Sequence, residues 1–223
     1  MLFRSSRSKP AALQADPTND LFWRFNMRRL TAEEIRDSIL NLTGQINFRM
    51  GGASIYSEVP GDVLRTASRP GAAWGKSSPA ERNRGSVYIF VKRSLREPFL
   101  ECFDWADTDN TCDVRFVTTV PTQTLTMLNS KLLNDASEQL AQRLMVDRPD
   151  DLAGQVRRAL ELATSRRALK PEVEEGVALL SELREQLDLE PVAALQLFCL
   201  LVLNLIEFCY LDYRWSRAFS PFT

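Results

Sequence analysis

The sequence contains no histidine among its 223 residues. Histidine is the commonest general base, a frequent metal ligand and the side chain whose charge changes near neutral pH. Its absence excludes Ser-His-Asp and Cys-His catalytic mechanisms within this chain. It also excludes a covalent c-type haem site, because that attachment requires the motif C-x-x-C-H.

Cysteine is scarce, and the four cysteines (Cys102, Cys112, Cys199 and Cys209) have no C-x-x-C spacing. A four-cysteine zinc site is therefore not indicated. Cys102 and Cys112 flank an acidic loop and could close a disulfide in an oxidising compartment, which would stabilise the fold by roughly 2–3 kcal/mol. Cys199 and Cys209 lie on one predicted helix, too far apart to bond each other. We expect both to be buried as small apolar side chains.

The sequence also lacks an apolar run of the length that a membrane span needs. The most apolar stretch, residues 192–206, contains Gln196 and Asn204 and is shorter than the roughly 20 residues of a transmembrane helix. The first residues, MLFRSSRSKPAALQAD, lack the apolar core of a secretory signal. We therefore expect a buried helix near the C-terminus, no membrane span and no signal peptide in this chain.

The formal net charge is only −1, which gives the whole chain no attraction to nucleic acid or to an anionic membrane. Residues 1–100 contain 16 lysines and arginines against 9 aspartates and glutamates, whereas the remainder contains 12 against 20. This division favours two surfaces of opposite charge that face each other. The basic residues are scattered rather than clustered, so we expect no nucleic-acid partner.

The pattern of the first 85 residues predicts an extended arm over 1–18, followed by helices within 20–44 and a loop. Thr31 and Glu34 form a capping-box pattern ahead of IRDSILNLTG, and Gly44 is a typical helix stop. Residues 50–85 are rich in Gly, Ser, Pro and Ala, which predicts a long irregular loop, with Trp74 fixing it to the body.

The rest of the chain predicts a small β element followed by helices, so the expected fold is mainly α with a small β element (α+β). SVYIFVK (86–92) alternates as a strand does, VRFVTTV (114–120) is also strand-like, and the two could pair across the acidic loop. Residues 122–212 repeat apolar residues at helical spacing, with a break near Asn129–Ser130. We expect residues 19–223 to form a single domain.

The acidic loop between these two segments has oxygen-bearing side chains at alternate positions, as in an EF-hand: Asp107, Asp109, Thr111 and Asp113. The EF-hand template requires glycine at its sixth position and glutamate at its twelfth, where this chain has Cys112 and Thr118. The loop is therefore either a calcium loop of another kind or a turn whose aspartates pair with Arg93, Arg96 and Arg115. Short Asp/Asn-rich stretches usually make turns, so we predict no metal site.

Two further polar features could form a site. Asp104 and Asp107 could act as a carboxylate pair in acid–base chemistry. The hydroxyls and amides of VTTVPTQTLTMLNS, from Thr118 to Asn129, could bind a ligand at a helix N-terminus, or could be caps and back-bonded threonines. The second interpretation is favoured, because this stretch has no glycine and is not a phosphate-binding loop.

Three stretches resemble one family: DPTNDLFWRFNMRRLTAEEIRDSILNLTGQINFRMGG, RGSVYIFVKRSLREPFLECFDWADTDNTCDVRFVTTVPTQTLTMLNS and LNLIEFCYLD. They are similar to the C-terminal domain of unknown function 1553, common in large planctomycete proteins that also carry cytochrome-c-type domains. The resemblance covers about residues 12–212. It implies that haem belongs to upstream domains of longer members and that this chain has no cofactor. It also implies that full-length members are exported or periplasmic.

The resemblance implies no established activity, so it assigns no catalytic residue. Our candidates for a polar site or network are Arg93, Arg96, Asp104, Asp107, Arg115, Thr118, Gln123 and Asn129. We expect a non-catalytic interaction or packing module at the C-terminal end of such proteins, whose partners are the upstream domains or another subunit. The alternative is part of an exported enzyme acting on a polar polymer such as polysaccharide, with an Arg/Asp-lined site.

Overall fold

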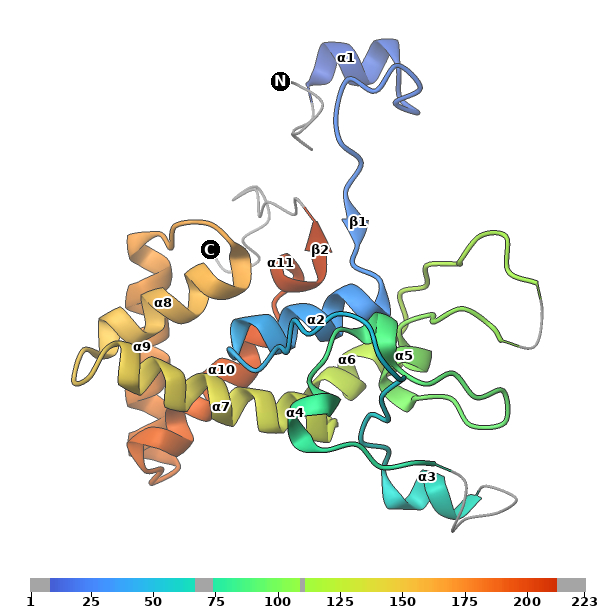
Figure 1. Cartoon of the computed structure of the whole chain (residues 1–223). Helices are drawn as coiled ribbons and strands as arrows, with labels where there is room; N and C mark the ends of the chain where they lie inside the picture. Colours follow the sequence, from blue (N-terminus) through green and yellow to red (C-terminus); the bar gives the residue numbers. More distant parts are fainter. Residues whose placement is uncertain (1–8, 67–73, 109–110, 212–223) are drawn as a thin grey trace.

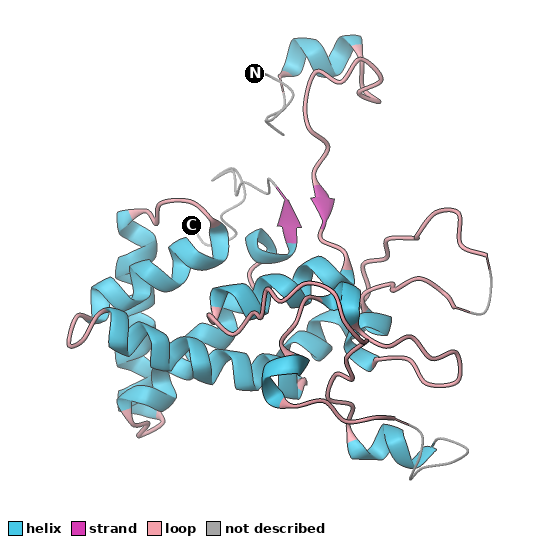
Figure 2. Cartoon of the chain, in the orientation of Figure 1, coloured by secondary structure: helices cyan, strands magenta, loops and turns pink. Residues whose placement is uncertain are grey.

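The computed structural model describes residues 9–66, 74–108 and 111–211 (Figure 1). Helices make up most of this part of the chain, and its one sheet has two short strands (Figure 2). The prediction of a mainly α fold with a small β element is therefore confirmed.

The C-terminal half is built from α7 (Lys131–Asp147), α8 (Leu152–Thr164), α9 (Lys170–Gln186) and α10 (Pro191–Leu203). Leucines on one face of α7 pack against α10 in the centre of the core (Figure 1). The fully buried side chains of this contact are Leu133, Leu140, Leu144, Leu195 and Leu203.

Gly176 of α9 allows a close approach to α8 and α10. A Cβ built there would lie 2.6 Å from Val156 Cγ1 of α8 and 3.1 Å from the Phe198 ring of α10. Since real Cβ atoms essentially never come so close, any larger residue would push these helices apart.

The last predicted helix is interrupted. Asn204 follows α10 and donates its side-chain amide to Leu200 O at 2.7 Å, and Leu205 is extended. A separate short helix, α11 (Ile206–Cys209), follows. Cys199 and Cys209 therefore lie on two helices, and the prediction of one helix is wrong.

The capping-box prediction is confirmed in α2 (Ala32–Leu42). Thr31 Oγ1 accepts from Glu34 N, and Glu34 accepts from Thr31 N at 2.8 Å. Gly44 ends this region with a φ of 75°, which glycine adopts without strain. Ile35 and Ile39 of α2 are fully buried against the helical half.

The arm before α2 differs from the prediction. Residues 1–8 lie outside the described part, and Pro10–Ala15 form a helix, α1, rather than an extended segment. Of the helices expected within 20–44, none forms over residues 20–31. Asp16 instead accepts hydrogen bonds from Asp20 N and Leu21 N, and such side-chain bonds compete with helical ones.

The segment from residue 50 to 85 is irregular as predicted in its described residues, 50–66 and 74–85, apart from two short helices, α3 (Gly61–Thr66) and α4 (Pro79–Arg82). Trp74 packs edge-on against Tyr56, 5.5 Å between ring centroids, and donates to Ser57 O at 2.8 Å. The Trp74 ring also lies 6.1 Å from the Phe90 ring, so its contacts join the segment to itself and to the residues just after it, and its fixing of the loop to the body stays a prediction.

Both predicted strands are wrong. Ser86–Tyr88 form a 3-10 turn, η3, because the Asp37 carboxylate of α2 accepts from Ser86 N at 2.8 Å and draws the chain to that helix. Within residues 86–92, only Ile89 forms a β-bridge, an isolated parallel bridge with Ile55. Residues 114–120 form no strand, and their polar groups bind side chains instead of a neighbouring strand.

The observed strands are β1 (Arg28–Arg29) and β2 (Tyr210–Leu211), which pair antiparallel. They bring the start of α2 beside the end of the helical half (Figure 1). Two more helices complete the fold: α5 (Pro98–Cys102) packs against α2, and α6 (Pro121–Asn129) packs against α5 and α7.

Candidate functional site

Asp104, a predicted site residue, binds an arginine that the sequence analysis did not single out. Arg29 of β1 is buried, and its Nη2 donates to Asp104 Oδ2 at 2.7 Å and to Phe103 O at 3.1 Å. Its Nη1 donates to Thr118 O at 2.8 Å. The guanidinium also lies 5.4 Å from the centre of the Phe103 ring. Arg29 therefore joins β1, the end of α5 and the loop before α6.

Thr118 and Gln123 complete this network. Thr118 N donates to Asp104 Oδ2 at 2.9 Å, and Thr118 Oγ1 donates to Oδ1 at 2.8 Å. Gln123 Nε2 donates to Thr118 Oγ1 at 3.3 Å. Burial alone would raise the pKa of Asp104, but the bonds from Thr118 and Arg29 outweigh it and lower that pKa. Both carboxylate oxygens of Asp104 thus accept hydrogen bonds from other residues of the protein.

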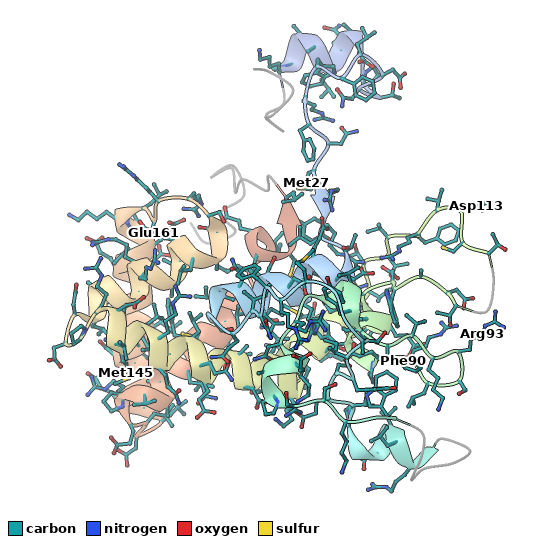
Figure 3. The ribbon with its side chains drawn as sticks, viewed as in Figure 1. Met27, Phe90, Arg93, Asp113, Met145 and Glu161 are labelled. Atoms are coloured by element: carbon teal, nitrogen blue, oxygen red, sulfur yellow. The ribbon has the colours of Figure 1, made fainter. Side chains whose placement is uncertain are left out.

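The other predicted residues lie outside this network. Arg96 pairs with Asp107, and Arg115 Nη1 donates to both oxygens of Glu33 at 2.8 Å. Asn129 donates to Leu125 O of its own helix at 2.9 Å. Arg93 has no ion pair within the described residues and lies on an outer loop (Figure 3). The structure therefore brings together five of the eight candidates in two separate groups: the network of Asp104, Thr118 and Gln123, and the pair Arg96–Asp107.

The four cysteines have free thiols. Cys102 Sγ lies 3.1 Å from Thr126 Oγ1, and Cys112 is exposed. Cys199 is fully buried, as predicted, and burial raises the pKa of its thiol to about 12. Cys209 is only partly buried, although its pKa is also raised, to about 11.

Large apolar side chains are exposed on the two segments that meet at β1. They belong to the arm before β1 and to the residues just before Thr118. Each is more than half exposed: Leu21, Phe22, Met27, Val114, Phe116 and Val117. We call this set the β1 surface. Met27 and Asp113 mark these two segments in Figure 3, where the arm extends upward from the body and the loop extends to the right. Single exposed apolar residues are normal, but several on each of two segments that meet at β1 make these segments candidates for an interaction surface.

A second buried centre contains two arginines that the sequence analysis did not propose for a site. Arg84 is almost completely buried and donates to three main-chain carbonyls, those of Arg49, Gly51 and Ala53. Its guanidinium stacks on Tyr88 at 3.9 Å from the ring centre.

Arg36 of α2 is the second arginine of this centre. Its Nη1 donates to Arg84 O and to Ser86 Oγ, both at 3.1 Å, and its Nη2 donates to Arg82 O at 2.6 Å. The contacts join residues nearly fifty positions apart, so no local sequence signal marks them.

A cleft of about 440 Å³ opens beside Arg36, bounded by α2, the segment 57–61, α4 and the start of α7. We call it the α2 cleft. Glu97 lines it and also caps α5, accepting from Leu100 N at 2.6 Å. Burial raises the pKa of Glu97, against the opposing effects of the Leu100 bond and the Arg36 charge. A buried carboxylate with a raised pKa in a cleft is a typical feature of functional sites.

The raised pKa of Glu97 predicts a pH dependence of stability. The folded state binds the Glu97 proton more tightly than the unfolded state does. The resulting stabilisation is therefore present below the unfolded pKa, about 4.3, and is lost as the pH rises through the folded pKa. The free energy of unfolding of the wild type should therefore decrease as the pH rises through the folded pKa of Glu97. We expect this decrease to be smaller in the Glu97→Gln variant, as measured by urea titration at several pH values. An equally steep fall in the variant would contradict this assignment.

The part of the chain that the structure describes contains no cluster of three or more His, Cys, Asp or Glu side chains that could bind a metal ion. No helix there has the length and apolar character needed to cross a bilayer.

Comparison with known proteins shows that the chain matches a family model. The family with the description "Protein of unknown function (DUF1553)", also named PSD1, matches residues 3–180, which is most of the chain. No curated protein and no solved structure matches significantly.

Proposed function

Because the chain belongs to the family of unknown function DUF1553, whose description names no reaction, we propose a function from the surface of the chain itself. The protein is a non-catalytic module that binds another polypeptide through the β1 surface. The observation that supports this proposal most strongly is the set of exposed apolar side chains on both segments that meet at β1.

The hydrogen bonds and ion pairs of the predicted polar residues support this proposal. Three hydrogen bonds from Arg29 and Thr118 fix the position of the Asp104 carboxylate and favour its ionised form, as is usual for a structural carboxylate. Asp107 is paired with Arg96. These residues fix the loop that displays Val114, Phe116 and Val117, so their role is to hold the binding surface in place.

The chemistry of the β1 surface indicates the kind of partner. Phe22 and Phe116 are large apolar anchors, and such side chains dominate binding energy at protein interfaces. Arg28 and Arg115 lie beside them but are already paired with Glu34 and Glu33. The partner is therefore a polypeptide with an apolar groove, either an upstream domain of a longer family member or a separate subunit.

We expect the purified chain to bind the dye ANS and to self-associate in sedimentation velocity experiments, because its apolar surface is uncovered. Phe22→Ser combined with Phe116→Ser should reduce dye fluorescence at least about twofold and favour the monomer. The melting temperature should stay unchanged, since neither ring is part of the core.

Val146→Ser is the matched control, because Val146 is equally exposed at the far end of α7. It should change neither dye binding nor association. A wild-type chain that stays monomeric at high concentration and binds no dye would contradict the proposed function.

A further inference from the structure

The α2 cleft is separate from the β1 surface, and its charged lining is balanced. Three cationic and three anionic side chains line it: Arg36, Arg82, Lys131, Glu58, Glu97 and Asp135. At its rim Arg82 binds Glu58 at 2.9 Å, and Lys131 pairs with Asp135 and lies 3.7 Å from Glu58. These pairs neutralise one another, so the cleft has no strong preference for a charged ligand.

Deeper in the cleft, polar groups have unused hydrogen-bonding capacity. Ser57 is buried, lines the cleft, and its hydroxyl has no hydrogen-bond partner within the described residues. Arg36 and Glu97 both line the cleft but form no ion pair there with each other. Arg36 Nη2 carries two protons and donates one of them in its hydrogen bond to Arg82 O, which leaves the other for a ligand. A ligand hydroxyl could accept from this guanidinium and donate to the carboxylate, because a hydroxyl does both.

The remaining lining combines amides with aliphatic side chains. Gln45, Asn83 and Gln139 each offer a donor and an acceptor. Ile39, Leu40, Val59 and Leu132 form the apolar part. A volume of about 440 Å³ lies within the range of small-molecule sites.

We propose that the α2 cleft binds a neutral polyhydroxylated ligand, a sugar unit, between Arg36, Glu97 and Ser57. Its hydroxyls satisfy the Ser57 hydroxyl and bridge the guanidinium and the carboxylate. Its C–H face lies on the aliphatic side chains. This binding does not depend on the β1 surface, so the module can hold a saccharide and a polypeptide at once.

The test is titration of the full-length chain with neutral hexoses and their disaccharides, followed by NMR of the labelled protein. Inorganic phosphate, glucosamine and glycylglycine serve as charged comparators. We expect saturable shifts of residues 57–61 and of α2 with one or more neutral sugars, and much weaker shifts with the comparators. Saturable binding of a comparator alone would overturn the sugar assignment, and the absence of shifts with every neutral sugar would overturn the site.

Two variants separate binding from folding. Ser57→Ala removes a hydroxyl that has no protein partner, so affinity should fall about three- to tenfold with an unchanged melting temperature. Gly61→Phe places a ring at the cleft, where an added Cβ meets no atom within 4 Å, and should abolish binding. Val146→Phe, on the exposed end of α7, is the control and should bind normally. Sugar binding that Gly61→Phe leaves intact would place the ligand elsewhere and contradict the proposal.

Discussion

Replacing Arg29 by methionine is expected to lower the free energy of unfolding by about 3–5 kcal/mol, because it breaks a buried ion pair and leaves a partner carboxylate without its cation. Arg29 is almost fully buried and donates to Asp104, Phe103 O and Thr118 O. Methionine keeps much of the contact with Phe103 but none of these bonds. Urea unfolding followed by circular dichroism measures the change.

Arg28→Met is the matched control at the adjacent residue. Arg28 pairs with Glu34 at 2.8 Å, but both side chains are more than 40% exposed. Exposed pairs contribute about 0–1 kcal/mol, so this variant should lose little stability. Equal losses from Arg28→Met and Arg29→Met would show that the buried network has no special role.

Arg84→Met is expected to cost a similar amount, about 3–5 kcal/mol, and to release the segment 49–53. The variant leaves three main-chain carbonyls without their donor, those of Arg49, Gly51 and Ala53. We therefore expect faster cleavage within residues 49–53 in limited proteolysis, together with the lower unfolding free energy. Arg49→Met, whose side chain is mostly exposed, is the control and should retain the wild-type cleavage pattern.

The features that the sequence predicts correctly depend on neighbouring residues. The capping box of Thr31 and Glu34 and the left-handed Gly44 involve contacts within a few positions. The break before α7 is of the same kind, because Ser130 ends α6 and caps α7 through Leu133 N. Local hydrogen bonds of this kind can be recognised from the order of residues alone.

The features that the sequence does not predict depend on distant contacts. The alternation of residues 86–92 indicates a strand, but Asp37 and Arg36, about fifty residues earlier, bind Ser86 and fold the segment into η3. The true strands have two residues each and pair across almost the whole chain, so they have no recognisable pattern. The α2 cleft likewise assembles from five separate segments.

The candidate polar residues illustrate the same division. Asp104, Thr118 and Gln123 lie near one another in sequence and are brought together in the structure. Arg29 completes their network from 75 positions away, which no spacing within the acidic loop could indicate. The Arg29–Asp104 pair of this network and the separate Arg96–Asp107 pair both join the basic first part of the chain to the acidic second part.

The most direct test of this account is a double-mutant cycle between Arg29→Met and Asp104→Asn, measured by urea unfolding. Asparagine suits the left-handed backbone of Asp104, whose φ is 61°, so the cycle isolates the interaction rather than backbone strain. If the pair holds the loop that displays the β1 surface, the two losses should be coupled by about 1.5–3 kcal/mol. Losses that add within about 0.5 kcal/mol would contradict the conclusion that Asp104 is a structural residue paired with Arg29.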